Sequence, residues 1–511
     1  MSAPDVIIVG AGSAGCVLAN RLSADPTRRV LLLEAGGEGH SLTTRIPAAF
    51  PRLFKTPADW ALETEPEPGL NDRLLYWPRG RMLGGSSAMN AMLWMRGHAE
   101  DYDAWEAAGN PGWGWRDVLP AFRRAEDHRA ATGEHVGHDG PMRIDHQREP
   151  SPLTRSWLEA AMESGFPIRD DLNHGSSEGV GLLHVSQRGG KRESTATAYL
   201  RPARLRPNLT VTTGVQVLRI AFDGSRAAGV EVRHATGAIE WIAAGHVVLC
   251  AGAVHSPHLL MCSGIGPGSS LRDAGVAVRV DLPGVGQNLQ DHLVAGIGVR
   301  CREPASLLAA ERPWRLLQWL LTRSGPLTSP VAEGAGYLRS DPSVDRPDLE
   351  LIFAPTFFVD HGFSNPPGHG YTLGAVLLRP ESRGSTSLRS ADPLAAPVIR
   401  PGYLTDAADL PRLVAGLRSC RQIAAASAFG RWRGAEALPG EGACTAEQLA
   451  EHVRNTAQTL YHPVGTCAMG TGLHAVVSPK LEVHGVERLS VVDASIMPTI
   501  ISGHTNAPTI M

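Results

Sequence analysis

The 511-residue chain has no apolar run that approaches the ~20 residues needed to span a bilayer, which excludes a membrane-spanning helix. It also lacks a basic excess: 48 Lys and Arg against 51 Asp and Glu give a net charge of −3, which argues against nucleic-acid binding. Its seven cysteines form no CxxC pair, so we expect neither a metal site nor a disulfide framework. A first strand near Asp5 leaves no room for a signal peptide, and we expect a cytoplasmic protein.

The first 37 residues have the pattern of a strand, a glycine turn, a helix and a second strand that ends in an acid. In Gly10-x-Gly12-x-x-Gly15, the first glycine permits the tight turn and the second lets the backbone approach a pyrophosphate. The third lets the helix pack closely on the strand. Glu34 can accept hydrogen bonds from ribose hydroxyls. The pattern predicts a dinucleotide whose phosphates lie at a helix N-terminus, and it does not distinguish NAD from FAD.

Strand patterns return much later in the chain, and the length indicates two or more domains. The run at 246–250 is continuously apolar, as expected of a strand buried in a parallel sheet. Residues 408–455 have a helical pattern. Further strand candidates are 209–212, 215–220, 228–232, 239–243, 348–354, 371–378 and 486–493.

Five segments, in chain order, resemble signatures of the glucose–methanol–choline (GMC) family of FAD oxidoreductases. They are residues 79–90, 252–266, 284–292, 461–467 and 503–509, and the similarity extends from residue 5 to residue 509. The resemblance favours FAD over NAD.

We therefore expect an α/β fold in which a Rossmann-like FAD-binding domain is joined to a second, α+β substrate-binding domain built on an antiparallel sheet. The FAD-binding domain is expected to be discontinuous. It would comprise residues 1–150, 185–300 and 455–511, and the substrate-binding domain residues 151–184 and 301–454.

The segment from Gly84 to Ser87 has little side chain, so its backbone N–H groups can approach a planar ring or a pyrophosphate. The resemblance implies that residues 90–93 lie beside the reactive edge of the flavin, Val217 by the adenine and Asp493 on the ribityl chain. The expected FAD-binding residues are Gly10, Gly12, Ser13, Gly15, Glu34, Arg81, Gly84, Gly85, Asn90, Ala91, Met92, Leu93, Val217, Ala251, Asp493, Ala494, His504, Asn506, Pro508 and Thr509.

Met89 occupies the position at which some members of the family have a histidine bonded covalently to the flavin. Methionine cannot form that bond, so we expect non-covalent FAD.

Flavin-dependent oxidation of an alcohol needs a base for the O–H proton while a hydride passes to flavin N5. Histidine suits this role because its ordinary pKa is about 6.5. The resemblance assigns the base to His462 and its partner to Asn506, whose amide can donate to the substrate oxygen. His504 would lie on the same face of an extended segment as Asn506, and it could act in catalysis, contact the flavin or hold the loop.

Other candidates have two interpretations each. Glu333 could bind a cationic substrate or be a structural acid. Tyr461, Phe357 and Phe358 could form an apolar wall for the substrate or belong to the core. The histidines His255, His258 and His292 are expected to satisfy local backbone groups.

The predicted function is FAD-dependent oxidation of a primary alcohol to an aldehyde, with O₂ or a quinone-type carrier as electron acceptor. Aromatic and heteroaromatic, aliphatic and choline-like alcohols all remain open as substrates. The alternative is an FAD-containing hydroxynitrile lyase, which uses the same base without redox turnover. The sequence does not specify the oligomeric state.

Overall fold

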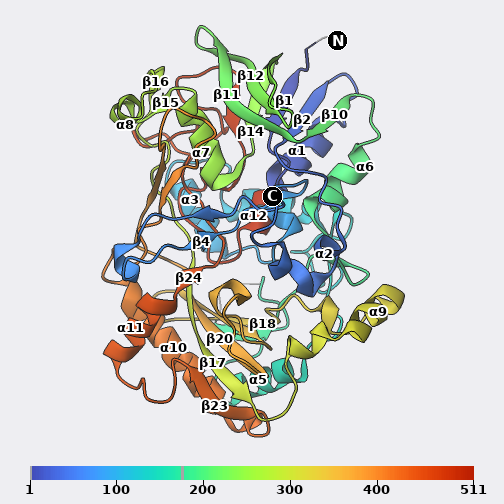
Figure 1. Cartoon of the computed structure of the whole chain (residues 1–511), viewed down its shortest axis with the longest axis vertical. Coiled ribbons are helices and arrows are strands. Elements are labelled where there is room, and N and C mark those ends of the chain that lie inside the picture. Colours follow the sequence, from blue (N-terminus) through green and yellow to red (C-terminus); the bar gives the residue numbers. More distant parts are fainter. Residues whose placement is uncertain (1–2, 174–177) are drawn as a thin grey trace.

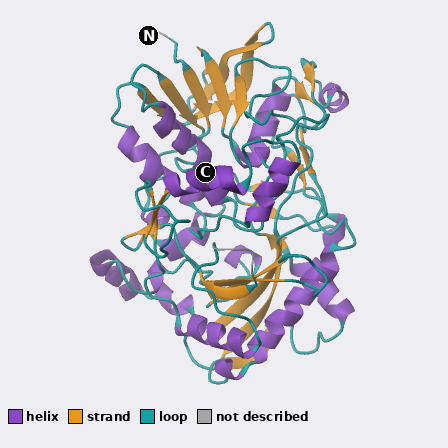
Figure 2. Cartoon of the chain, turned by 180° about the vertical axis from the view of Figure 1, so that it is seen from behind, coloured by secondary structure: helices purple, strands orange, loops and turns teal. Residues whose placement is uncertain are grey.

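The computed structural model describes residues 3–173 and 178–511, so the parts of the expected domain ranges at 1–2 and 174–177 lie outside the described residues. Two sheets lie at opposite ends of the long axis, the first near the N-terminus and the second around β17 and β20 (Figure 1). Helices and loops lie between and around them (Figure 2). No helix within these ranges is long and apolar enough to cross a membrane.

The first sheet is parallel and has the strand order β10-β2-β1-β14-β25. Its strands are β1 (Val6–Val9), β2 (Val30–Glu34), β10 (Leu209–Thr213), β14 (His246–Leu249) and β25 (Leu489–Val491). Their apolar runs are buried because helices and loops cover the sheet. Helix α1 (Ser13–Leu22) follows the glycine turn after β1. The expected Rossmann-like sheet is therefore confirmed, and it joins segments far apart in the chain.

The strands expected between residues 215 and 243 form a sheet of their own. It is antiparallel, with the order β11 (Val215–Asp223), β12 (Arg226–His234) and β13 (Ile239–Ala243).

The second large sheet is antiparallel and has seven strands. Its order is β23 (Arg433–Leu438), β17 (Leu293–Cys301), β20 (Gly370–Leu377), β19 (Leu349–Ala354), β18 (Gly334–Leu338) and β7 (Gly179–Leu182), with β24 (Gln458–Thr459) also paired to β17. Helix α10 (Asp409–Ala425) packs on one face. There, the Cβ of an alanine at Gly416 would lie 2.5 Å from the Cβ of Ala375, so glycine permits this close approach. Alternate residues on the other face, among them Gly296, Ile352 and Thr372, line a cavity.

Strand pairing differs from the sequence expectation at two places. Residues 293–300 were expected in the FAD-binding domain, yet β17 pairs with β20 over its length and belongs to the second sheet. β24 likewise pairs with β17, although 455–511 was expected to belong to the FAD-binding domain. Residues 408–455 are not helical throughout, because β23 separates α10 from α11 (Ala446–Thr456). These differences arise because long-range pairing decides the sheet to which a strand belongs.

The remaining elements lie between and around the sheets (Figure 2). The helices are α2 (Leu42–Arg45), α3 (Ala99–Ala107), α4 (Trp115–Ala125), α5 (Pro152–Glu163), α6 (Arg201–Ala203), α7 (Gly252–Cys262), α8 (Gly268–Asp273), α9 (Pro313–Thr322) and α12 (Asn506–Ile510). The strands are β3 (Leu62–Glu63), β4 (Tyr76–Trp77), β5 (Glu126–His128), β6 (Met142–Ile144), β8 (Gln187–Arg188), β9 (Lys191–Arg192), β15 (Ile265–Gly266), β16 (Val280–Asp281), β21 (Ser385–Ser387) and β22 (Val398–Arg400).

Candidate active site

A cavity of about 580 Å³ extends from the glycine turn after β1 to the inner face of the second sheet. It is lined by most of the residues expected to bind a cofactor: Gly10, Gly12, Ser13, Glu34, Gly85, Asn90, Ala91, Met92, Leu93, Val217, Ala251, Asp493, Ala494, His504, Asn506 and Thr509. Gly15, Arg81, Gly84 and Pro508 are not among the lining residues. Gly15 instead permits packing, because a Cβ there would lie 1.9 Å from the carbonyl oxygen of Gly10.

The dinucleotide end of the cavity is built from two glycine segments in backbone contact. A Cβ at Gly85 would lie 2.7 Å from the Cα of Gly12, so no side chain fits between the segments. The N-terminus of α1 has no side-chain cap, which leaves its first N–H groups available to an anion. Glu34 accepts hydrogen bonds from the backbone N–H groups of Ala11 (2.9 Å) and Gly36 (2.8 Å). Burial nevertheless raises the pKa of Glu34 to about 7.

The turn at residues 90–93 is held in an uncommon conformation. Met92 has a φ of 62°, and its N–H donates to Oδ1 of Asn90 at 3.0 Å. The same oxygen accepts from Nη1 of Arg192 at 2.8 Å. The carbonyl of Met92 accepts from the backbone N–H of Ser186 at 2.8 Å. This strain persists because the surrounding bonds fix the turn.

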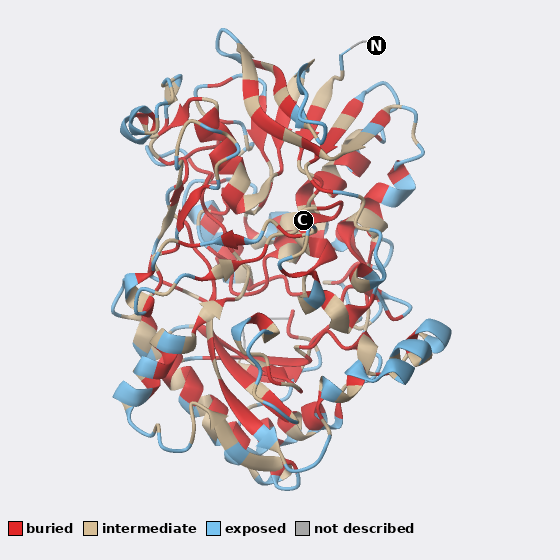
Figure 3. Cartoon of the chain, in the orientation of Figure 1, coloured by how far each residue is buried: buried red, intermediate tan, exposed pale blue. Residues whose placement is uncertain are grey.

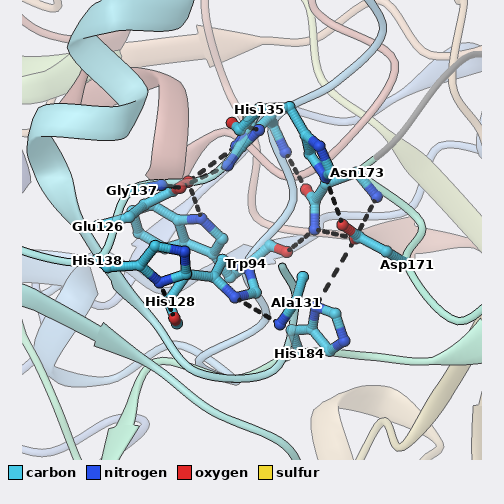
Figure 4. A network of polar contacts seen from close by, with 11 residues as sticks. Trp94, Glu126, His128, Ala131, His135, Gly137, His138, Asp171, Asn173 and His184 are labelled. Carbon is cyan, nitrogen blue, oxygen red and sulfur yellow. Dashed lines mark hydrogen bonds and ion pairs between the residues drawn. The ribbon is translucent and has the colours of Figure 1, made fainter. Parts of the chain in front are cut away.

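A buried polar network anchors the segment that follows this turn (Figure 4). Nε1 of Trp94 and Nε of Arg96 each donate to Oε1 of Glu126 at 2.8 Å. Asn173 joins the same segment, accepting from the N–H of Arg96 at 2.8 Å and donating to the carbonyl of Trp94 at 3.2 Å. The Arg96–Glu126 ion pair is fully buried, and its charges are compensated by these bonds.

Asp291 positions the backbone of His462. One of its oxygens accepts from the N–H of His462 at 2.7 Å, and the other accepts from the hydroxyls of Tyr403 and Thr459 at 2.5 Å each. Burial raises the pKa of Asp291, although these donors and Arg79 oppose the shift.

A chain of hydrogen bonds determines which nitrogen of His462 carries a proton. Nε2 of His292 lies 3.1 Å from the carbonyl oxygen of Leu378, which can only accept, so this nitrogen carries the hydrogen. Burial lowers the pKa of His292 to about 3, so its ring is neutral and Nδ1 is an acceptor. Nδ1 of His462 lies 3.0 Å away and must donate to it. Nε2 of His462 therefore has a free lone pair. Burial, with His504 and His292 nearby, holds the pKa of His462 well below its usual range.

His292 was expected to satisfy a local backbone group, and this expectation was incomplete. Its carbonyl partner, Leu378, directly follows β20 and is distant in sequence, and its second nitrogen contacts His462 across 170 positions of sequence.

His504 and Asn506 do not lie on an extended segment as expected, because Asn506 begins α12. Both still line the cavity. Nε2 of His504 lies 3.1 Å from Oε1 of buried Glu350, and its ring centroid lies 4.7 Å from that of His462. Oδ1 of Asn506 accepts from the hydroxyl of Ser13 at 2.8 Å, which leaves the amide nitrogen as a donor.

Of the four expected substrate residues, two line the cavity and two do not. Tyr461 and Phe358 line the cavity. Phe357 does not, because its ring packs in the core between Gly298 and Gly370. The cation-binding interpretation of Glu333 is wrong for this geometry: the side chain is fully buried and does not line the cavity. Its carboxylate accepts from Ser151 N–H (2.8 Å), Thr154 Oγ1 (2.5 Å) and Ser329 Oγ (2.6 Å).

Several lining residues were not identified from the sequence. The cavity wall beyond His462 includes Phe50, Phe54, Val294 and Ile352. Only the alternation of β17 and β19 could have indicated Val294 and Ile352, and it does not say which face meets a cavity.

Comparisons with known proteins agree along the chain. Family models described as GMC oxidoreductase match residues 4–294 and 380–511. The alcohol dehydrogenase [acceptor] of Pseudomonas putida is 42% identical over 99% of this chain and 94% of its own, and the mitochondrial choline dehydrogenase of Mus musculus is 41% identical over 99% and 87%. Among solved structures, pyridoxine 4-oxidase from Mesorbium loti superposes with a TM-score of 0.91 at 35% identity, over 99% of this chain and 97% of that one.

Proposed function

The chain belongs to the GMC oxidoreductase family. Because its relatives include an alcohol dehydrogenase and pyridoxine 4-oxidase, we propose that it is an FAD-dependent enzyme that oxidises a primary alcohol to an aldehyde with His462 as the general base. Bound FAD supplies the ring that takes the hydride from the alcohol carbon. The side chains of this protein bind the alcohol, orient it and accept its hydroxyl proton.

The residues of the cavity fit this cofactor. The glycine contact between Gly12 and Gly85 and the uncapped start of α1 suit a pyrophosphate, and Glu34 suits a ribose. The expected contacts of residues 90–93, Val217 and Asp493 with the flavin half are part of the proposal. Asp493 already bonds Gly252 N–H at 2.8 Å and Ser495 N–H at 2.9 Å, which holds it in place at the cavity wall.

The observation that carries the proposal is the 3.0 Å contact between Nδ1 of His292 and Nδ1 of His462, which leaves Nε2 of His462 with its lone pair. A neutral imidazole facing the cavity can take a hydroxyl proton, whereas an imidazolium could not. The amide nitrogen of Asn506 can donate to the same oxygen, since Ser13 already occupies its carbonyl. Together they favour alkoxide character on the oxygen as the hydride leaves the adjacent carbon.

The substrate is proposed to be an uncharged, apolar alcohol, aliphatic or aromatic. Among the described residues, the acids that line the cavity are Glu34 and Asp493, at the dinucleotide end, and Asp360. Phe50, Phe54 and Ile352 form much of the opposite wall. A quaternary ammonium site requires aromatic faces with a nearby acid, and the burial and bonding of Glu333 remove it from that role. Asp360 is exposed and accepts from the hydroxyl of Ser364 at 3.1 Å, so solvent screens its charge.

FAD is proposed to be held without a covalent bond, because Met89 lines the cavity at the position that carries a bonded histidine in some relatives. Acid precipitation of the holoenzyme should release the yellow chromophore into the supernatant. Chromophore retained in the pellet would contradict non-covalent binding.

An anaerobic panel of 1-octanol, benzyl alcohol and choline tests the substrate class and the reaction together. The expected result is rapid loss of flavin absorbance with one of the neutral alcohols and slow or no loss with choline. Flavin that stayed oxidised with every alcohol would contradict the oxidation itself, and faster bleaching by choline would contradict the apolar assignment. Reoxidation in air compared with reoxidation by a quinone then identifies the acceptor.

A further inference from the structure

Helix α9 exposes a wide apolar face to solvent. Trp314, Leu316, Leu317, Leu320 and Leu321 are all exposed, Leu321 at 76% and Leu317 at 56%, and Leu308 just before the helix is exposed at 40%. Trp319 is the buried residue of the helix, where its Nε1 donates to the carbonyl of Gly190 at 2.9 Å. Figure 3 shows α9 as a largely exposed element that extends from the side of the molecule.

Helix α9 turns its apolar face to solvent, whereas a surface helix of an ordinary soluble protein turns that face to the core. Trp314, Leu317 and Leu321 have the spacing i, i+3, i+7 and share one face, with Leu316 and Leu320 beside them. The polar residues Arg315, Gln318 and Thr322 occupy the other side. An amphipathic helix normally turns its apolar stripe to the core, so this stripe lacks the partner that its pattern predicts.

Basic residues lie at both ends of α9 and on its polar side, and Arg323 stacks over the ring of Trp319 at 4.2 Å. Between positions 305 and 325 the chain has three arginines, Arg312, Arg315 and Arg323, and one acid, Glu311. Glu311 lies 3.6 Å from Arg52, which offsets its charge. Arg315 stacks on Trp314 with its guanidinium carbon 3.8 Å from the ring centroid. On the other side, the hairpin of β8 and β9, which carries exposed Lys191, packs its Gly190 against Arg323.

We propose that α9 docks the protein on the surface of an anionic lipid bilayer, with its Leu and Trp side chains in the headgroup region and its arginines on lipid phosphates. An exposed apolar face with Trp and flanking arginines is the composition of an interfacial helix. The charge pattern favours lipid over a second copy of this chain, which would bring its own arginines to the contact. The face is also small, six exposed side chains against the roughly 20–30 residues that each side of a standard protein interface contributes.

The proposal does not depend on the reaction, so its test uses binding alone. The FAD-loaded full chain is floated with vesicles of phosphatidylcholine, with and without phosphatidylglycerol. We expect the protein to float with the anionic vesicles and to remain below with the neutral ones. Binding to neither kind of vesicle would overturn the proposal, and so would equal binding to both.

A double variant, Leu317→Glu with Leu321→Glu, should lower the bound-to-free ratio by at least about tenfold, because it removes buried methylenes and adds charge of the wrong sign. The matched control changes two exposed leucines elsewhere, Leu205→Glu and Leu473→Glu, whose exposures are 92% and 79%. The control keeps the same change of charge and residue type, and we expect it to bind as the unchanged chain does. An equal loss in both variants would contradict a role for α9.

Arg312→Gln should weaken flotation with anionic vesicles without altering the absorbance of bound FAD, which reports that the fold is intact. Sedimentation velocity tests the alternative that a second copy of this chain covers the apolar face of α9. If the unchanged chain were a dimer that became a monomer in the double variant and neither floated, α9 would be a subunit interface and the lipid proposal would fail.

Discussion

Two histidine clusters in the described part of the chain can be compared, because one of them lines the cavity and the other does not. The first contains His128, His135 and His184 beside Asp171, behind the segment of Trp94 (Figure 4). The second contains His292, His462 and His504. Burial lowers the pKa of His128 and of His292 to about 3, so a shifted pKa does not distinguish the clusters.

The two clusters differ in the contacts of their ring nitrogens and in whether the residues line the cavity. In the first cluster, carboxylate oxygens of Asp171 lie 3.5 Å from His135 and 3.7 Å from His184, and none of the three described histidines lines the cavity. In the second, the His292–His462 bond occupies Nδ1 of His462, and both His462 and His504 line the cavity. Access to substrate and a fixed tautomer, rather than clustering or burial, mark the candidate base.

Removal of His462 is the strongest test of this distinction. His462→Ala should slow anaerobic flavin reduction by the best alcohol roughly 10²- to 10⁴-fold, the usual contribution of a general base. We expect the FAD content to be unchanged. The measured quantity is the rate of bleaching per bound flavin. The matched control is His184→Gln in the other cluster, for which we expect the normal rate. A normal rate in His462→Ala, or an equal loss in both variants, would remove the basis of the comparison.

The role of His292 gives the second test, with an expected loss of about 10²-fold, the lower end of a general base's contribution. His292→Leu removes the acceptor for Nδ1–H of His462, so the ring can adopt the tautomer or orientation in which Nε2 is no longer a base. We expect kcat to fall with little change in KM. Glutamine can accept from His462 and donate to the carbonyl of Leu378, so His292→Gln should restore part of the rate. A structural role alone would lower both variants in proportion to their stability.

The sequence predicts best where function depends on adjacent residues. The glycine turn, Glu34 and the parallel strand pair β1–β2 follow from local sterics, and each forms as expected. His292 was assigned differently because its contact with His462 exists only after two distant segments meet. Two adjacent phenylalanines illustrate the same limit: Phe358 lines the cavity, Phe357 packs in the core, and the sequence does not determine which one turns inward.

Helix α9 shows the converse limit. Its pattern of Trp and Leu predicts a helix with one apolar face, but periodicity cannot say whether that face meets the core. In the second sheet, β23 was missed within a helical pattern, because pairing with β17 rather than local propensity forms it.

The pH dependence of stability and of activity gives the third test, which has the smallest expected effect. The two clusters should respond alike to pH in stability and differ in activity. An unfolded histidine titrates near pH 6.5, whereas His128 and His292 titrate at about 3 in the folded chain. Below pH 6.5 the unfolded state therefore binds more protons. Each histidine should then reduce the free energy of unfolding by up to about 1.4 kcal/mol per pH unit as the pH falls toward 3, and its contribution is fully present above 6.5.

His128→Gln and His292→Gln should thus each flatten the fall in the apparent urea midpoint between pH 7 and pH 5. Activity should separate them. Because the pKa of His462 lies below its usual range, the unchanged chain and His128→Gln should keep their rate of flavin reduction until the pH is well below 6.5. In His292→Gln the surroundings of His462 change, and the acid limb of the rate profile should shift. A limb at or above pH 7 in the unchanged chain would show that His462 is charged near neutrality, and the two clusters would then differ in access alone.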